Sequence, residues 1–133
     1  PFGFATFVKC RSKAFVIYMD KCGGGAVERA LNGVDGERPL THELISYILD
    51  GTETGLKSVL IYNEDEGTFF AKMTLVMKNE LGEKIIEIDS RPSDAITVAI
   101  RQKAPIYVSK SVLNKVEDSS AVLEEIRGKH FME

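Results

Sequence analysis

The side chains with the most evident chemistry gather in one short segment, residues 88–96, which reads IDSRPSDAI. Two carboxylates, Asp89 and Asp94, stand on either side of a polar turn. Carboxylate oxygens are the ligands that hard divalent cations prefer, so both could approach one Mg²⁺ or Mn²⁺. A cation held there would polarise a phosphoryl oxygen and activate water. The segment therefore predicts a metal-assisted site for phosphate chemistry, with Asp89 and Asp94 as catalytic and metal-binding residues.

Three further side chains of the segment are candidates for phosphate binding. Arg91 could hold a phosphate through its guanidinium fork, and Ser90 and Ser93 flank it at the start of a predicted helix, where N–H groups favour anions. A structural interpretation competes with this one. An acid such as Asp94 complements the dipole of a first helical turn, a serine there satisfies unpaired N–H groups, and Arg91 could simply pair with an acid. The sequence leaves both interpretations open.

A second candidate group lies at residues 38–45, which read RPLTHELI. Thr41 has the side chain of a helix N-cap, which places His42 at the first helical position, near solvent. An imidazole there could act as a general base or donate to a phosphate. Glu43, in the first turn, is the other candidate base. Either residue could take this role if the two segments converge in space; the competing interpretation of His42 is an ordinary surface histidine.

Hydrophobic periodicity and turn residues predict the elements that position these side chains. The predicted strands are 4–8, 14–18, 58–62, 68–77, 85–89 and 106–108, and the predicted helices are 26–31, 42–49, 92–103 and 121–127. A β-meander followed by a helix and a further strand implies a mixed, largely antiparallel sheet packed with helices. We therefore expect an α/β fold of the α+β kind. The predicted organisation is one compact domain over residues 1–116, with residues 117–133 as its helical tail.

Two predictions concern particular helices. The glycine run at 23–25 predicts a turn that leads into the helix at 26–31. Such a turn could cradle a phosphate, but it lacks the lysine of a P-loop and the spacing of a dinucleotide-binding loop, so a role in close packing is favoured. The helix at 92–103 carries apolar residues over a wide surface, which predicts the most buried helix of the domain.

Composition limits the remaining possibilities. A chain of 133 residues with 44% hydrophobic and 28% charged residues can form one domain with a substantial core. No apolar run approaches the roughly 18 residues of a membrane span, so we expect a soluble cytoplasmic protein without membrane contact. With two cysteines, Cys10 and Cys22, and only two histidines, we expect no Cys/His metal cluster. The net charge of −3 means that any binding of nucleic acid must rest on a local patch.

Three blocks of sequence together resemble a known family. Residues 38–44 (RPLTHEL), 88–96 (IDSRPSDAI) and 104–108 (APIYV) occur at the spacing of the bifunctional nuclease domain family. The resemblance covers roughly residues 4–116. Two features depart from the family pattern: its members usually begin with one more β-strand, and this chain has Asp-Lys-Cys-Gly-Gly-Gly at 20–25 in place of a Gly-x-x-Glu type of turn. The second departure affects any role of the first helix entry.

The resemblance implies an α/β fold and hydrolysis of phosphodiester bonds in RNA and DNA, with nucleic acid as the substrate. It does not assign the catalytic residues. The alternative is a non-enzymatic binding or regulatory module that recognises a small anion or a partner protein, and the negative net charge favours this alternative. In either case we expect a homo-oligomer, most simply a symmetric dimer.

Overall fold

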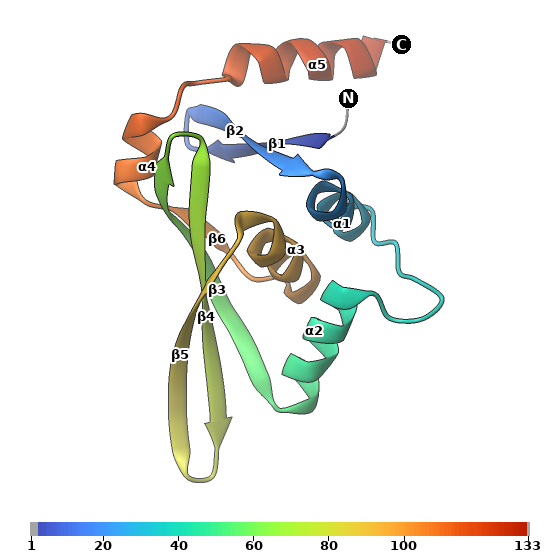
Figure 1. Cartoon of the computed structure of the whole chain (residues 1–133), viewed down its shortest axis with the longest axis vertical. Coiled ribbons are helices and arrows are strands. Elements are labelled where there is room, and N and C mark those ends of the chain that lie inside the picture. Colours follow the sequence, from blue (N-terminus) through green and yellow to red (C-terminus); the bar gives the residue numbers. More distant parts are fainter. Residues whose placement is uncertain (1–2, 133) are drawn as a thin grey trace.

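The chain forms a four-stranded sheet in the order β5-β4-β3-β6 (Figure 1). The computed structural model describes the backbone of residues 3–132 and the side chains of residues 3–126. The strands are β3 (Thr54–Asp65), β4 (Thr68–Asn79), β5 (Gly82–Ser90) and β6 (Ile106–Val108). The first three form an antiparallel meander, and β6 runs parallel to β3. The predicted mixed, largely antiparallel α+β fold is confirmed.

The other elements surround this sheet. A separate hairpin of β1 and β2 forms a two-stranded antiparallel sheet. Its strands are β1 (Gly3–Cys10) and β2 (Lys13–Asp20), and the helices are α1 (Lys21–Leu31), α2 (Thr41–Gly51), α3 (Pro92–Gln102), α4 (Lys110–Lys115) and α5 (Ser120–Met132). In Figure 1, α3 lies between the sheet, the hairpin, α1 and α2. The predicted hairpin, meander and final strand are all present.

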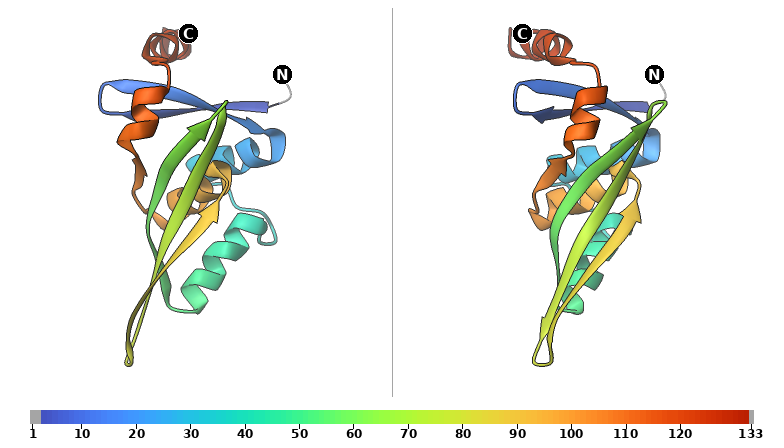
Figure 2. Two further views of the ribbon diagram at one scale, coloured as in Figure 1. Left: turned by 60° about the vertical axis from the view of Figure 1, so that its left-hand side comes forward. Right: turned by 90° about the vertical axis from the view of Figure 1, so that its left-hand side faces the viewer.

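One face of the sheet carries the hydrophobic core. Ala71, Met73 and Leu75 alternate along β4 and are buried against α3 and its neighbours, as the period of two predicts. The opposite face of the sheet differs in what covers it. In the right-hand view of Figure 2 the strands stand in front of α1, α2 and α3, and no helix of the part drawn as ribbon crosses in front of β4 and β5.

Helix α3 is the centre of the packing. More of its residues are buried than in any other helix whose side chains are described, including Ala95, Val98 and Ala99 at 1% exposure or less. It begins with Pro92 at its first position and ends at Lys103, which adopts a left-handed conformation with φ 56°. The prediction that this is the most buried helix is confirmed. Its first turn therefore sits on a rigid support.

The prediction of a glycine turn before the first helix is wrong. Gly23, Gly24 and Gly25 lie inside α1, which starts at Lys21 because Asp20 caps it by accepting a hydrogen bond from the N–H of Gly23 at 2.6 Å. The glycines permit close packing instead. A Cβ on Gly24 would lie 2.3 Å from the side chain of Phe4, so α1 can approach β1 only because this position has no side chain.

Two expectations about α2 are also corrected. The N-cap is Leu40, so Thr41 is the first helical residue and His42 the second. The helix begins one residue earlier because the N–H of Leu44 donates to the carbonyl of Leu40 at 2.8 Å, while Oε2 of Glu43 accepts from the N–H of Leu40. Helical spacing also predicts one apolar stripe on α2, formed by Leu44, Ile45, Ile48 and Leu49. This stripe is only partly buried, because Leu44 and Ile48 are 51% and 54% exposed.

The predicted helix of the tail is present and is longer than predicted. Helix α5 includes the predicted range 121–127 and extends to Met132, while residue 133 lies outside the described residues. The left-hand view of Figure 2 shows α5 above the β1–β2 hairpin. Asp118 joins the two by accepting a hydrogen bond from the N–H of Ala14 at 3.2 Å. Among the described residues, no helix is long and apolar enough to cross a membrane.

Candidate functional site

The junction between β5 and α3 holds a forked ion pair. Arg91 is the N-cap residue of α3 and has extended backbone angles, and Pro92 starts the helix. This places Asp94 one turn above Arg91. The Nε atom of Arg91 donates to Oδ2 of Asp94 at 2.9 Å, and its Nη2 donates to Oδ1 at 3.2 Å. The pairing engages two donors of the guanidinium and fixes its plane.

His42 reaches the same carboxylate from another part of the chain. Its Nε2 lies 2.8 Å from Oδ1 of Asp94, although the two residues are 52 positions apart in sequence. The side chains of His42 and Asp94 are 15% and 30% exposed, so both are shielded and yet open to solvent. The two sequence segments predicted to carry chemistry therefore converge at Asp94.

The charge state of Asp94 determines which nitrogen of His42 is available. Burial raises the pKa of Asp94, but hydrogen bonds from Arg91 and His42 outweigh it, and the net effect lowers the pKa. The ionised carboxylate can only accept, so it fixes the proton of a neutral imidazole on Nε2. The lone pair is then on Nδ1. This is the arrangement of a histidine oriented by a carboxylate for proton transfer.

A pocket adjoins the pair. Residues 17–20, 67–69 and 91–93 line a cavity of about 280 Å³ between the end of β2, the β3–β4 turn and the start of α3. Arg91 belongs both to this pocket and to the ion pair with Asp94, and its side chain is 65% exposed. An anion in the pocket would meet donors of the guanidinium that Asp94 leaves free. Arg91 thus connects the histidine and carboxylate to a binding space.

The two serines predicted to bind phosphate occupy different positions. Ser93 lines the pocket and is 8% exposed, packed so closely on α1 that a Cβ at Gly23 would lie 2.9 Å from its Cβ and Oγ. Ser90 lies opposite Ala71 on the core side of the sheet, and its buried Oγ has no hydrogen-bond partner within the described part of the chain. Only Ser93 is therefore placed beside the space that Arg91 borders.

Asp89 is not brought to Asp94. Its register partner on β4 is Lys72, on the side of the sheet away from the buried Ala71 and Met73. There its Oδ1 accepts a hydrogen bond from the hydroxyl of Tyr62 at 2.7 Å. In the region that the structure describes, no group of three or more histidine, cysteine or acidic residues could hold a metal ion. The donor set does not fit a metal, and the role of Asp89 and Asp94 as its ligands stays a prediction.

Glu43 occupies a structural position. Its side chain is buried, with an exposed fraction of 4%. Oε1 accepts from the N–H of Gly36 at 2.9 Å and Oε2 from the N–H of Leu40 at 3.1 Å, and Arg101 lies 3.8 Å away. These contacts hold the loop before α2 and thereby fix where the helix, and His42 on it, begins. The carboxylate is engaged away from Asp94.

Comparison with known proteins agrees with the three sequence blocks. The family described as "Bifunctional nuclease domain" matches residues 8–120. The chain belongs to the bifunctional nuclease domain family. The blocks at 38–44 and 88–96 are those that supply His42, Arg91 and Asp94, so the family match and the cluster of interacting side chains coincide in this domain.

The individual relatives share 30% to 34% of the aligned residues with this chain. An uncharacterized protein of Mycobacterium tuberculosis strain H37Rv is 34% identical over 97 residues, which is 73% of this chain and 55% of that protein. Bifunctional nuclease 2 and Bifunctional nuclease 1 of Arabidopsis thaliana are each 30% identical over 61% of this chain, which covers 24% and 25% of those proteins. The chain spans about half the length of the mycobacterial relative and about a quarter of the plant ones.

Sequence reasoning missed two residues of this bifunctional nuclease domain: Tyr62 beside Asp89, and Arg101 in the last turn of α3. Tyr62 was assigned only as a strand residue, because its contact with Asp89 depends on a register shift between Ile61 and Asn63. Arg101 binds Asp35 at 2.8 Å and so helps to anchor the loop before α2. Its place in the last turn of the helix was the available signal, but its partner lies 66 residues away.

Proposed function

We propose that this bifunctional nuclease domain hydrolyses phosphodiester bonds of RNA and DNA at the cluster of His42, Asp94 and Arg91. The observation that carries the proposal is the 2.8 Å contact between His42 Nε2 and Asp94 Oδ1, beside an arginine that borders a pocket. The family and the names of the plant relatives support a nuclease-related activity. The geometry supports a separate role for each of these three side chains.

His42 is the proposed general base. When Asp94 is ionised and the proton of the neutral imidazole is on Nε2, the Nδ1 atom of His42 can accept a proton from the attacking water. Asp94 keeps the imidazole in this tautomer and stabilises the imidazolium that forms, in the way a carboxylate supports histidine in other hydrolases. The protonated imidazole can then return the proton to the leaving oxygen. In RNA the same nitrogen could instead deprotonate the neighbouring 2′-hydroxyl.

Arg91 is the proposed phosphate ligand. The hydrogen bond with Asp94 raises the pKa of Arg91, so the guanidinium carries its charge throughout the reaction. Donors that face the pocket can bind the non-bridging oxygens, and charge that develops there in the transition state strengthens these bonds. Ser93, on the same pocket wall, could add a hydroxyl donor. No step is assigned to a metal, because the described side chains do not form a ligand set.

The proposal is tested by cleavage of labelled single-stranded RNA and DNA, in Mg²⁺, in Mn²⁺ and in EDTA. His42→Ala should reduce the rate by about 10² to 10⁴, the usual contribution of acid–base catalysis. Arg91→Lys keeps the charge but breaks the fork with Asp94, and it should be slower than Arg11→Lys, a matched change at an exposed position in the β1–β2 turn. Circular dichroism checks that each variant is folded.

Two results would count against this function. Equal cleavage by wild type, His42→Ala and Arg91→Lys would remove the site. Absence of cleavage by the pure wild-type protein in all three buffers would remove the activity and favour a non-enzymatic module that binds a small anion beside Arg91. The net charge of −3 is the observation that favours this second candidate, because a nucleic-acid enzyme usually carries a basic surface.

A further inference from the structure

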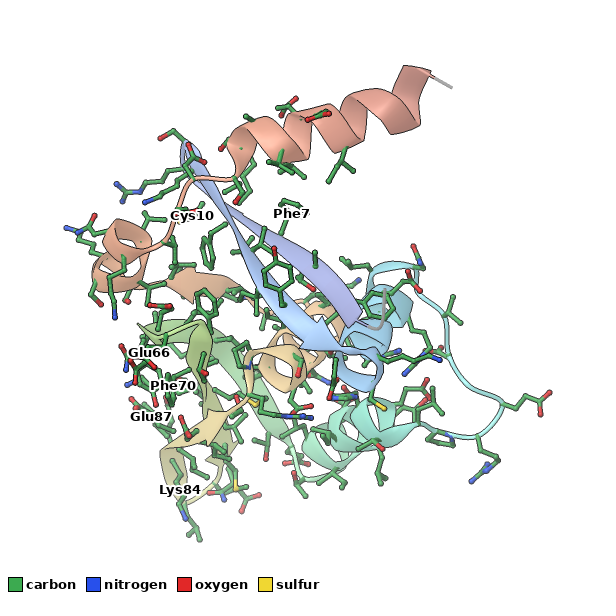
Figure 3. All side chains as sticks on the ribbon, turned by 45° about the horizontal axis from the view of Figure 1, so that its top comes forward. Phe7, Cys10, Glu66, Phe70, Lys84 and Glu87 are labelled. Carbon is green, nitrogen blue, oxygen red and sulfur yellow. The ribbon has the colours of Figure 1, made fainter. Side chains whose placement is uncertain are left out.

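The sheet has an exposed surface that we call the outer face. It consists of side chains that alternate with the buried core residues on the three meander strands: Leu60 and Tyr62 on β3, Phe70, Lys72, Thr74 and Val76 on β4, and Ile85, Glu87 and Asp89 on β5. Figure 2 shows these strands in front of the helices in its right-hand view, and Figure 3 shows Phe70 and Glu87 on the side of the sheet away from α3. Apolar and charged groups are mixed on this surface.

Two aromatic rings stand at one end of the outer face. The rings of Tyr62 and Phe70 are 6.3 Å apart between centroids and tilted by 46°. The hydroxyl of Tyr62 donates to Asp89 at 2.7 Å, which fixes the orientation of the ring. Lys72 places its Nζ over one side of the Tyr62 ring, 5.3 Å from the ring centroid. Two adjacent aromatic side chains with a cation beside them are the elements from which proteins build stacking platforms for nucleobases.

The acids of the outer face have partners of their own. Asp89 accepts from Tyr62, and Glu87 lies 3.3 Å from Lys72. Their charges limit the attraction of the surface for a phosphate backbone, in keeping with the acidic net charge of the chain. Affinity for a ligand on the outer face must therefore come mainly from contact with the rings and less from counterion release.

The outer face leads directly to the candidate site. The last register pair of β4 and β5 is Ala71 with Ser90. Phe70 and Arg91 are the residues that directly follow this pair on the two segments. The neighbouring residues Thr68 and Phe69 line the same pocket as Arg91. A strand bound over Phe70 would thus end beside the chain segment that carries Arg91.

The other end of the outer face carries further cations. Lys57 and Lys78 line a hollow of about 490 Å³ together with Glu53 and Glu83, and Glu83 lies 3.9 Å from Lys78. From Phe70 to Lys78 the distance along β4 is about 26 Å at ~3.3 Å per residue. This length suits a short stretch of extended single strand, and OB folds bind segments of about 4 to 16 nucleotides on comparable surfaces.

We propose that the outer face binds single-stranded nucleic acid, with bases stacked on Tyr62 and Phe70 and the backbone running past Lys72 to Arg91. The inference rests on the proposed nuclease function and specifies its substrate as unpaired strands. Bases in a duplex are already stacked on each other and cannot lie flat on the two rings. A second copy of the chain could also cover this face, and the experiment separates these occupants.

Binding is measured by fluorescence anisotropy of labelled oligonucleotides of about ten nucleotides, as single-stranded RNA, single-stranded DNA and duplex of the same sequence. The protein carries His42→Ala to prevent turnover. Tyr62→Leu with Phe70→Leu keeps apolar volume and removes the stacking rings. The matched control is Tyr47→Leu, an aromatic residue on α2 that is 54% exposed and away from the outer face.

The double variant should bind single strands at least about 30-fold more weakly, since one base–aromatic stack is worth about 5-fold to about 100-fold in affinity. Tyr47→Leu should bind like the parent, and duplex should bind more weakly than either single strand. Unchanged binding by the double variant, or equal binding of duplex, would overturn the inference. A third contrary result would come from sedimentation: the parent protein is a dimer, the double substitution dissociates that dimer, and neither protein binds the oligonucleotide.

A measurement that needs no variant of the sheet covers the case in which the double variant does not fold. Oligonucleotides containing 5-iodouracil are photocrosslinked to the His42→Ala protein, and the adducts are located by mass spectrometry. Adducts on Tyr62 or Phe70 are expected; adducts confined to other surfaces would contradict the proposal. Crosslinking at the rings without cleavage by wild type would remove the nuclease function and keep this binding face, whereas cleavage with adducts elsewhere would do the reverse.

Discussion

His42 on α2 and Asp94 on α3 are joined by a 2.8 Å contact across 52 residues of sequence. The same carboxylate receives the fork of Arg91. The cost of partly burying the Asp94 carboxylate is thus offset by hydrogen bonds from two side chains, Arg91 and His42, which lie on different elements. This arrangement makes Asp94 a group whose ionisation is tied to the folded state.

The first prediction concerns acid stability. Because the pKa of Asp94 is lowered in the folded protein, the unfolded state takes up the proton first as pH falls. The contribution of Asp94 to the free energy of unfolding is therefore fully present above its unfolded pKa of about 3.9 and is lost as the pH falls through its folded pKa. Urea unfolding of wild type and Asp94→Asn should show a difference at neutral pH that shrinks below about pH 4.

The Asp94 prediction is contradicted by one clear result. A stability difference between wild type and Asp94→Asn that stays constant from neutral pH to the acid limit would show that the carboxylate gains nothing from Arg91 and His42. Arg91→Lys serves as the matched comparison, because it should retain the acid dependence through His42 and weaken it only in part.

The second prediction separates structure from catalysis at Glu43. Glu43→Gln replaces one acceptor oxygen by an amide donor that faces an N–H of Gly36 or Leu40. The loss should lower the free energy of unfolding by about 1–3 kcal/mol, while the cleavage rate per folded molecule stays within a few-fold. Urea titration and single-turnover cleavage measure the two quantities. Glu37→Gln, an exposed acid of the same loop, should change neither.

The Glu43 test can also favour the catalytic interpretation that the sequence suggested. A variant as stable as wild type but slower by a hundredfold or more, about the lower limit for loss of a general base, would assign the proton transfer to Glu43. In that case the contacts with Gly36 and Leu40 would have to open in the working enzyme.

The features that were predicted correctly from the sequence are those that depend on residues close together in the chain. Alternation along β4 and the apolar surface of α3 identified the core, and the structural interpretation of Arg91 predicted that it pairs with a nearby acid, Asp89 or Asp94. The sequence did not predict the helical glycines of α1, because glycine is a poor helix former on its own. Only the approach of Phe4 makes the missing side chain of Gly24 useful.

The candidate site was predictable only in part for a related reason. Local patterns placed His42 and Asp94 at two helix starts, and the family resemblance connected the two segments. The distance between them is set by packing of α2 on α3. Asp89 shows what the sequence could not predict. Alternation along β5 places it on the face opposite the core, and its contact with Tyr62 depends on a β-bulge that has no clear sequence signal.

The third prediction tests the packing that supports Ser93. In Gly23→Ala the new Cβ would lie 2.9 Å from Ser93 and 3.0 Å from Oδ1 of Asp20, so α1 or α3 must shift. The variant should lose about 1–3 kcal/mol of unfolding free energy. Gly25→Ala is the control, because its Cβ would meet only Nη1 of Arg29 at 3.4 Å. That change should be neutral or add up to about 1 kcal/mol from helix propensity.

Thermal or urea unfolding of the two glycine variants decides the matter, and the order of stability is the critical result. Gly25→Ala above wild type and Gly23→Ala below it would confirm that α1 uses glycine for contact. Equal stabilisation by both changes would show that α1 has room at Ser93. The cleavage rate of Gly23→Ala should fall as well, because the helix start that carries Arg91 and Asp94 would move with Ser93.

The last prediction concerns the phenol of Tyr62. Its hydrogen bond to Asp89 is the main reason that the pKa of Tyr62 is raised above the ordinary value of 10.0, since ionisation would place a phenolate against a carboxylate. Asp89→Asn should lower this pKa towards the ordinary value, which a pH titration of the tyrosine ring signals by NMR can follow. Glu87→Gln is the matched control, because Glu87 pairs with Lys72 and has no contact with the Tyr62 hydroxyl. An unchanged Tyr62 titration in Asp89→Asn would show that the ring is not anchored, and with it the fixed stacking surface of the outer face would be lost.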